Sequence, residues 1–503
     1  MAKINEIEEY LSSKAGALSF EIIQYLVNIG NTPDNARKKL SRAKVKKLLN
    51  INFQHNAKFY YLEKQWGTPE YWKSLLTAMR ISGSVYATAL DGISAKGGLI
   101  VEANFPIISG APIKQKKHIS SEKVLERLIA IQAVNKVSVE KLGACIQLNP
   151  FIIGTGEKNV SARMTVEYIQ LLAIKDWLIK LGFASYNKIK IRDFSNQELP
   201  QVSTTCWDLV GPSYLLPLVS KTTSNLKPGF MTCDVFIDDI QSTYQIEYLI
   251  KKVKALSALS NVAPIMPIVV ARSFENGAFH KLKSEGIIAA TLENLFGIEI
   301  EKAFKGLLLA LTHAATIATN DPNLIHDLFN KLGSIEGAAG HLRGDLFEMI
   351  VGHLVHVREG YNIDIGEVVR EPMSNQTREI DVRGVRGREK IWHCECKSHQ
   401  PDYLVTLPEV EVWLNKNVPI IYKAEKAKRP EWHNSKFIFE YWTCGDFEKD
   451  ALAYLCSQKE KIKKYEINWK NGEDVREYAR GSQVRSICET LDKHYFKHPM
   501  KIL

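Results

Sequence analysis

The sequence predicts a multidomain protein that combines α/β and α+β domains in one chain. Its 503 residues exceed the roughly 300 that one hydrophobic core supports, so three or four domains are expected. Hydrophobic residues make up 45% of the chain and charged residues 24%, as is typical of globular domains. Helical and strand patterns alternate in the C-terminal third, which favours an α/β core in that region.

The composition also bounds the environment of the protein. No apolar run is long enough to cross a membrane, and the first residues, MAKINEIEEYL, form an acidic amphipathic pattern rather than a signal peptide. The eight cysteines show neither a disulfide framework nor zinc-site spacing. We therefore predict a cytoplasmic protein with no membrane partner. The net charge of +10 is a weak indication of a polyanionic partner.

Basic residues concentrate near the N-terminus, in a stretch without any acidic residue. They are Arg37, Lys38, Lys39, Arg42, Lys44, Lys46 and Lys47. Thr32 followed by Pro33 predicts a helix start, so we expect a basic helix over 32–47, preceded by helices at 4–12 and 19–29. Two short strands are predicted over 49–63.

This order of three helices and a hairpin resembles a winged helix-turn-helix domain, which we assign to 1–68. According to this resemblance, the recognition helix is 32–47 and the wing is 49–63. It implies that Arg37, Lys38, Arg42 and Lys44 contact DNA. The alternative is a solvated basic helix in a domain that binds protein. A second helical, winged-helix-like domain is predicted over 69–158.

The C-terminal region carries acidic residues on two predicted neighbouring strands. Because successive strand side chains point to opposite faces, Glu379, Asp381 and Arg383 share one face of the first strand. In HCECKSH, at 393–399, the polar face is formed by His393, Glu395, Lys397 and His399, and Cys394 and Cys396 face the interior. Asp381 and Glu395 should then meet, with Lys397 beside them. Close carboxylates repel unless a cation separates them, and oxygen ligands favour Mg²⁺ or Mn²⁺.

Upstream, 342–362 has the pattern of an amphipathic helix that carries Glu348. A helix with Glu, a strand with Asp and a strand with Glu-x-Lys together resemble the core of the PD-(D/E)XK nuclease superfamily. A helix near 406–416, strands at 418–423 and 437–443 and a helix from Gly445 extend the similarity to Mrr-type restriction endonucleases, over about 335–470. The chain lacks the Gly-rich approach to the catalytic Asp of that type and has Glu395 where that type has Gln.

The resemblance implies a restriction-endonuclease-like α/β/α core over 335–503 that hydrolyses phosphodiester bonds. Asp381, Glu395 and the carbonyl of Cys396 would hold Mg²⁺, or Mn²⁺ in its place. Glu348 would complete the metal shell or hold a second ion. Lys397 would orient or deprotonate the attacking water. Arg378 and Arg383 are the expected phosphate ligands of this domain. For His393 and His399, contact with phosphate and a position on the strand without a functional role are both open.

Residues 159–300 are predicted to form a central α/β domain, and 301–334 a helical linker. Glu167, Asp208 and Asp234 follow the order of the nuclease acids, but Phe236 stands where the lysine is expected. Two interpretations remain open for this region. It is either a generic α/β domain or an inactive, degenerate nuclease-like domain.

The predicted function is a metal-dependent DNA endonuclease, and the Mrr resemblance implies restriction or antiviral defence, with DNA and a defence-system protein as partners. A homodimer is favoured, since cutting both strands with one site per chain calls for two copies. One alternative is a repair or recombination nuclease that acts on branched or single-stranded DNA. Another is a DNA-binding regulator with a non-catalytic nuclease fold, which the intact set of Glu348, Asp381, Glu395 and Lys397 disfavours.

Overall fold

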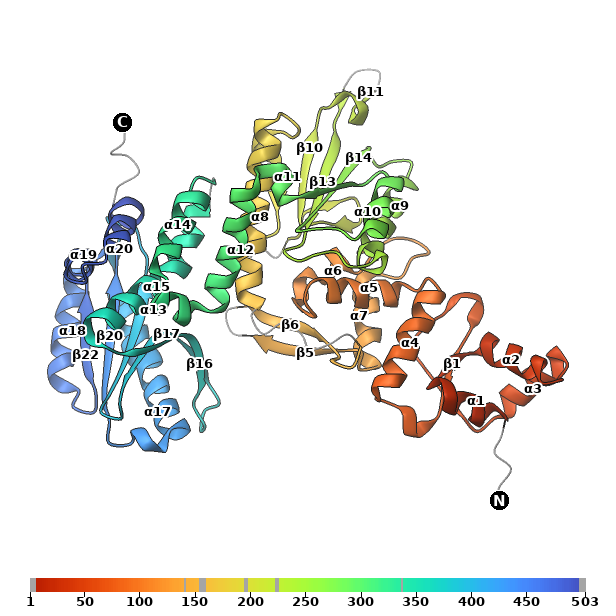
Figure 1. Cartoon of the computed structure of the whole chain (residues 1–503), viewed down its shortest axis with the longest axis horizontal. Helices are drawn as coiled ribbons and strands as arrows, with labels where there is room; N and C mark the ends of the chain where they lie inside the picture. Colours follow the sequence, from red (N-terminus) through yellow and green to blue (C-terminus); the bar gives the residue numbers. More distant parts are fainter. Residues whose placement is uncertain are drawn as a thin grey trace. The chain divides into compact units, whose positions relative to one another are not determined.

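A computed structural model describes residues 6–139, 142–152, 160–193, 198–221, 226–335 and 338–496 (Figure 1). It is a mixed α/β structure with several separate sheets, which agrees with the predicted fold class at that level. The chain divides into two compact units. The first comprises Met1–Ser161 and Trp177–Leu295, and the second comprises Ala162–Asp176 and Phe296–Leu503. Within the described ranges, every helix is too short or too polar to cross a bilayer.

The first unit begins with three helices and a small antiparallel sheet of order β1-β3-β2. The elements are α1 (Glu6–Lys14), β1 (Ala17–Leu18), α2 (Ser19–Asn28), α3 (Pro33–Arg42), β2 (Lys46–Lys47) and β3 (Phe59–Tyr61). Ile7, Leu11, Ile22, Leu26 and Leu40 form the core between the helices. The helices therefore follow the predicted order, and the two-residue strand β1 was not predicted.

The third helix differs from its predicted extent at its C-terminal end. It begins as expected, with the Thr32 hydroxyl accepting a hydrogen bond from the Asn35 N–H at 3.3 Å. It ends at Arg42 instead of 47, because the following residues become extended and Lys46 and Lys47 pair with β3. Of the two short strands predicted over 49–63, the second is confirmed by Phe59–Tyr61, and the first is wrong because 49–53 forms no strand.

A second set of elements follows with the same order. The elements are α4 (Pro69–Ile81), α5 (Val85–Ala95), β4 (Leu99–Val101), α6 (Phe105–Ile108), α7 (Ser121–Ala130), β5 (Val134–Val139) and β6 (Gly143–Leu148). From α5 onward they run helix, strand, helix, helix and two strands, as α1 to β3 do. The sheet order β4-β6-β5 likewise matches β1-β3-β2. The first unit thus contains two helical subdomains of one topology.

The first unit continues with a five-stranded sheet of order β15-β14-β13-β10-β7. Its strands are β7 (Lys190–Ile191), β10 (Leu209–Ser213), β13 (Gly229–Val235), β14 (Ile265–Ala271) and β15 (Ile288–Thr291). The long helix α8 (Val160–Lys180) precedes the sheet in the chain, and α9 (Glu247–Ser257) and α10 (Asn276–Ser284) connect its later strands. One hydrophobic cluster extends from Phe59 through Trp72 to Ile287, so the sheet shares its core with the helical subdomains.

The second unit is built on a sheet of order β16-β17-β18-β20-β22. Its strands are β16 (Asn362–Arg370), β17 (Thr377–Arg386), β18 (Lys390–Lys397), β20 (Lys436–Thr443) and β22 (Glu466–Lys470). Its main helices are α12 (Ile298–Thr312), α13 (Ala314–Asn320), α14 (Pro322–Leu332), α15 (Ala338–Glu359), α16 (Leu407–Val412), α17 (Val418–Lys428), α18 (Lys449–Lys461), α19 (Gly472–Gly481) and α20 (Arg485–Thr490).

One predicted element of the second unit is wrong. The segment 418–423 was expected to be a strand, and it is the first part of α17. A short apolar run fits a buried strand and a buried helix equally well, so local pattern does not decide between them. The chain instead continues from α16 through a π-helical turn at Trp413–Asn417, and Val418, Ile421 and Ala424 turn one face of α17 inward.

Candidate active site

The acidic residues of the C-terminal sheet lie on adjacent antiparallel strands, as predicted. Val382 on β17 is opposite Cys394 on β18, so Asp381 and Glu395 flank this pair. The Cys396 N–H donates a hydrogen bond to Oδ2 of Asp381 at 2.8 Å, which fixes the carboxylate against the neighbouring strand. This bond lies just past the paired residues, where the two strands begin to separate.

The lysine of the Glu-x-Lys segment completes this group. Its Nζ lies 2.7 Å from Oε1 of Glu395 and 3.7 Å from Oδ2 of Asp381. The side chain of Lys397 is 37% exposed, whereas those of Asp381 and Glu395 are 12% and 16% exposed. The three charged groups therefore form a semi-buried cluster that solvent reaches from the side of the lysine.

Lys397 neutralises one of the two carboxylate charges in the cluster. Burial acts to lower the pKa of this lysine, but the carboxylates of Glu395 and Asp381 outweigh burial and raise the pKa above its usual value. The ammonium group is therefore charged at neutral pH and lies beside both acids. A cation is required at this position whenever both carboxylates are ionised, because like charges at short range repel.

Glu348 approaches the cluster from α15, whose buried face contains Leu346, Phe347, Ile350, Val351 and Leu354 as predicted. This helix contacts β16, β17 and β18. Burial raises the pKa of the Cys396 thiol, and the nearby Cys394 thiol and the carboxylates of Asp381 and Glu348 raise it further. Glu348 thus lies close enough to Cys396 on β18 to affect its pKa.

The atoms available to a metal ion are oxygens. Burial raises the pKa of Cys394 to about 11, and Cys396 is shifted in the same direction, so both remain thiols. Two carboxylates and the main-chain carbonyl of Cys396 make an oxygen-only set, which suits Mg²⁺ or Mn²⁺ better than zinc. In the part of the chain that the structure describes, no group of three or more His, Cys, Asp or Glu side chains is arranged to hold a metal.

Two residues predicted to face the wet side of the strands are buried instead. The side chain of Arg383 is 1% exposed, and its guanidinium lies 2.6 Å from Asp364, 2.6 Å from Glu367 and 3.2 Å from Glu425. His393 stacks on Phe439, with ring centroids 4.8 Å apart. Both predictions assumed an open strand face, but α17 contacts β16 and β17 and brings Glu425 over this region. The guanidinium that was predicted to contact phosphate is thus held by three carboxylates in this structure.

The other predicted residues of this domain lie at its margins. Nε of Arg378 donates a hydrogen bond to Oδ1 of Asn417 at 2.9 Å, and this arginine is half-buried. His399 follows β18 and packs against Tyr403, with ring centroids 3.9 Å apart. Neither residue is part of the cluster around Asp381.

Removing the Arg383 guanidinium should destabilise the second unit strongly. Arg383→Leu would leave the fully buried Glu425 carboxylate without its closest arginine, and losing one partner of a buried pair costs about 3–5 kcal/mol. Arg378→Leu on the same strand removes a bond to a neutral partner and should cost only about 1 kcal/mol. Urea unfolding followed by tryptophan fluorescence compares the two variants. Equal, small losses would contradict the structural role assigned to Arg383.

The predicted DNA-contacting residues are exposed in the first unit. Arg37, Lys38 and Arg42 project from α3, and Lys44 follows its end. The nearest acidic neighbour of Arg37 is Asp34 at 3.3 Å, and both side chains of this pair are more than half exposed. Exposed pairs of this kind contribute little to stability, so the four charges are available to a partner.

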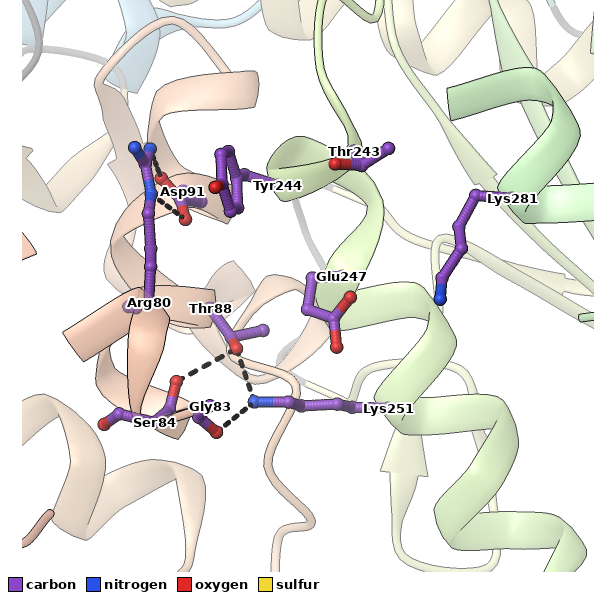
Figure 2. Close-up of a pocket in the computed structure, with 11 residues that line it drawn as sticks. Arg80, Gly83, Ser84, Thr88, Asp91, Thr243, Tyr244, Glu247, Lys251 and Lys281 are labelled. Carbon is purple, nitrogen blue, oxygen red and sulfur yellow. Dashed lines mark hydrogen bonds and ion pairs between the residues drawn. The ribbon is translucent and has the colours of Figure 1, made fainter. Parts of the chain in front are cut away.

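A pocket of about 440 Å³ lies between α5 and α9 in the first unit (Figure 2). Arg80 pairs with Asp91 and stacks over Tyr244, with its guanidinium carbon 4.1 Å from the ring centroid. On the other side, Nζ of Lys251 donates to the Thr88 hydroxyl at 2.7 Å and to the Gly83 carbonyl at 3.0 Å (Figure 2). Lys251 thus joins α9 to the subdomain of α4–β6 at the pocket, and Arg80 is held by Asp91, so we assign the pocket no ligand.

Comparison with protein-family models, curated proteins and solved structures finds no match to this chain. The resemblance to PD-(D/E)XK nucleases and winged-helix domains therefore stays a prediction from the sequence. The cluster of Asp381, Glu395 and Lys397 is the feature that carries a functional interpretation.

Proposed function

We propose that this protein is a metal-dependent DNA endonuclease with its active site at Asp381, Glu395 and Lys397. The observation that carries the proposal is the cluster itself. Two carboxylates on adjacent strands converge, and the lysine two residues after Glu395 lies within 2.7 Å of one carboxylate and 3.7 Å of the other. Metal-assisted hydrolysis of a phosphodiester uses carboxylate oxygens to hold the ion, and a cationic side chain beside them can contact the water or the phosphate.

The residues divide the work of hydrolysis as follows. Mg²⁺ bound by Asp381, Glu395 and the Cys396 carbonyl would neutralise phosphate charge and acidify a bound water. The Cys396 N–H holds Asp381 in a fixed orientation, which keeps its carboxylate preorganised. Lys397, the most exposed of the three side chains, can donate a hydrogen bond to the attacking water or to a phosphate oxygen. Glu348 supplies a further carboxylate from α15.

DNA is the proposed substrate because of the N-terminal subdomain. Its order of helix, strand, two helices and two strands, with sheet order β1-β3-β2, supports the winged-helix assignment. The exposed basic face of α3 supports nucleic-acid binding. A role in restriction or antiviral defence, a homodimeric active form and a cytoplasmic location follow from the sequence resemblance and are part of the proposal.

Cleavage should require Mg²⁺ or Mn²⁺ and should stop in EDTA, because the two acids and Lys397 alone offer no group that acidifies water. Ca²⁺ should support DNA binding without cutting, since its looser coordination positions the water poorly. The test incubates supercoiled plasmid with the protein and each metal, and follows nicking and linearisation on agarose gels. The Asp381→Asn variant is the matched control for a contaminating nuclease.

Three results would change the proposal. Full cleavage in EDTA would rule out the metal mechanism. DNA binding without cleavage under every metal would instead favour a DNA-binding regulator. A preference for branched or single-stranded substrates over plasmid would favour a repair or recombination nuclease.

A further inference from the structure

The sheets of the two units have the same topology. In the second unit, β16 to β18 are antiparallel neighbours, and β20 and β22 then add in parallel. In the first unit, β7, β10 and β13 are antiparallel neighbours, and β14 and β15 then add in parallel. Each sheet follows a long helix in the chain, α8 with 21 residues and α15 with 22. Strand order, direction and connection therefore repeat.

The acidic residues also correspond, and a hydrogen bond shows it. Leu209 is opposite Cys233 in the first sheet, as Val382 is opposite Cys394 in the second, so Asp208 corresponds to Asp381. The Val235 N–H donates to Oδ2 of Asp208 at 3.0 Å, as the Cys396 N–H donates to Oδ2 of Asp381 at 2.8 Å. By the same register Asp234 takes the place of Glu395, and Phe236 takes the place of Lys397.

Basic side chains from other elements surround these two acids. Nζ of Lys96, at the end of α5, lies 3.4 Å from Oδ2 of Asp208 and also donates a hydrogen bond to the carbonyl of Val235. Nζ of Lys252 on α9 lies 2.6 Å from Oδ2 of Asp234. Nε of Arg192 lies 2.7 Å from Oδ1 of Asp208. Three cations from three parts of the chain thus converge on the acid pair.

This cluster is closed to solvent. The side chains of Lys96 and Asp208 are 6% and 1% exposed, and those of Lys252 and Asp234 are 1% and 0% exposed. By comparison, Lys397 in the second unit is 37% exposed. Burial acts to raise the pKa of Asp208, but Lys96 and Arg192 outweigh it and hold the pKa below its usual value. The aspartate is therefore an anion that depends on its basic neighbours.

We propose that the central domain is a second copy of the C-terminal α/β fold, in which the Lys96 ammonium occupies the position of the metal ion. Lys96 bonds to the Asp208 carboxylate and the Val235 carbonyl, which correspond to the Asp381 carboxylate and the Cys396 carbonyl. Phe236 fills the place of the lysine, and its ring centroid is 5.0 Å from Nζ of Lys96. This site has no catalytic activity. Without a metal, it links the subdomain of α4–β6 to the sheet of β7, β10, β13, β14 and β15.

The test uses the full chain carrying Asp381→Asn and Glu395→Gln, so that no metal effect arises at the C-terminal site. In this background Lys96→Ala removes the ammonium and leaves room for an ion. We expect the melting temperature to fall by on the order of 5 °C or more, and Mg²⁺ or Mn²⁺ to restore part of that loss. The background protein itself should show no such response to metal.

Lys251→Ala is the matched control, because this lysine is the neighbour of Lys252 on α9 and bonds to the Gly83 carbonyl and the Thr88 hydroxyl. It should lower the melting temperature without creating a response to metal. A Lys96→Ala variant that is as stable as the background, or that responds to metal no more than Lys251→Ala, would overturn the proposal. Because the readout is thermal stability, the result is independent of whether the C-terminal site cleaves DNA.

If Lys96→Ala does not fold, a second measurement tests whether Lys96 and Asp208 act as a pair. Lys96→Met preserves most of the side-chain volume, and its effect should shrink when Asp208→Asn is added, because the unpaired buried anion is then gone. Losses in melting temperature that simply add in the double variant would show that Lys96 and Asp208 do not act as a pair, and would equally overturn the proposal.

Discussion

Asp381→Ala, Glu395→Ala and Lys397→Ala should each abolish DNA cleavage while the protein stays folded and binds DNA. Catalytic groups that act as a unit are not additive, so losing any one member removes most of the rate, here by about 10²-fold or more. The Asp381→Ala and Glu395→Ala variants should lose affinity for the metal ion. The Lys397→Ala variant should keep that affinity and lose the ammonium group that donates a hydrogen bond beside the metal. A combined measurement of cleavage rate and metal affinity separates these two kinds of loss.

Lys390→Ala is the matched control for this series, since Lys390 begins the same strand that Lys397 ends. It should cleave like the wild type. Melting curves show whether each variant is folded, and fluorescence anisotropy with a labelled duplex in Ca²⁺ shows whether it binds DNA. Any variant that keeps more than about a tenth of the wild-type rate would remove that residue from the active site.

The acid and lysine cluster was predictable from sequence because strand alternation is a local rule. Knowing that 377–386 and 390–397 are adjacent strands is enough to place Asp381, Glu395 and Lys397 on one side. The same rule gave the wrong environment for Arg383 and His393, because their burial depends on a third element, α17. That element lies about 30 residues further along the chain and was predicted to be a strand.

The buried cluster around Asp208 also could be predicted only in part, because its basic residues come from distant parts of the chain. The order of Glu167, Asp208 and Asp234, with Phe236 in place of a lysine, is visible in the sequence. The basic side chains that take the place of a metal there cannot be identified from the sequence, because Lys96 and Asp208 are 112 residues apart and belong to different subdomains. Glu167 is buried on α8 beside Arg163, with Nε and Oε1 3.9 Å apart. Periodicity identifies which acids share a face, but only the tertiary structure identifies what neutralises them.

Neutralising Arg37, Lys38, Arg42 and Lys44 should weaken DNA binding and flatten its dependence on salt. Each phosphate contact that is lost removes roughly 0.9 from the slope of log affinity against log salt, so four contacts would remove about 3.6. Lys44 is the weakest member of the set, because α3 ends at Arg42 and Lys44 lies on the extended segment that leads into β2. Restoring Lys44 alone should therefore recover the least affinity.

Stability and metal binding should change little in this variant. The four side chains are exposed, and the pair of Arg37 with Asp34 is exposed on both sides. Neutralising Lys459, Lys461, Lys463 and Lys464, which are exposed at and beyond the end of α18, changes the net charge equally and serves as the control. Titrations at several salt concentrations compare the two variants. If both lower the slope equally, net charge rather than α3 governs binding; if neither does, the N-terminal subdomain binds protein and DNA is held elsewhere in the chain.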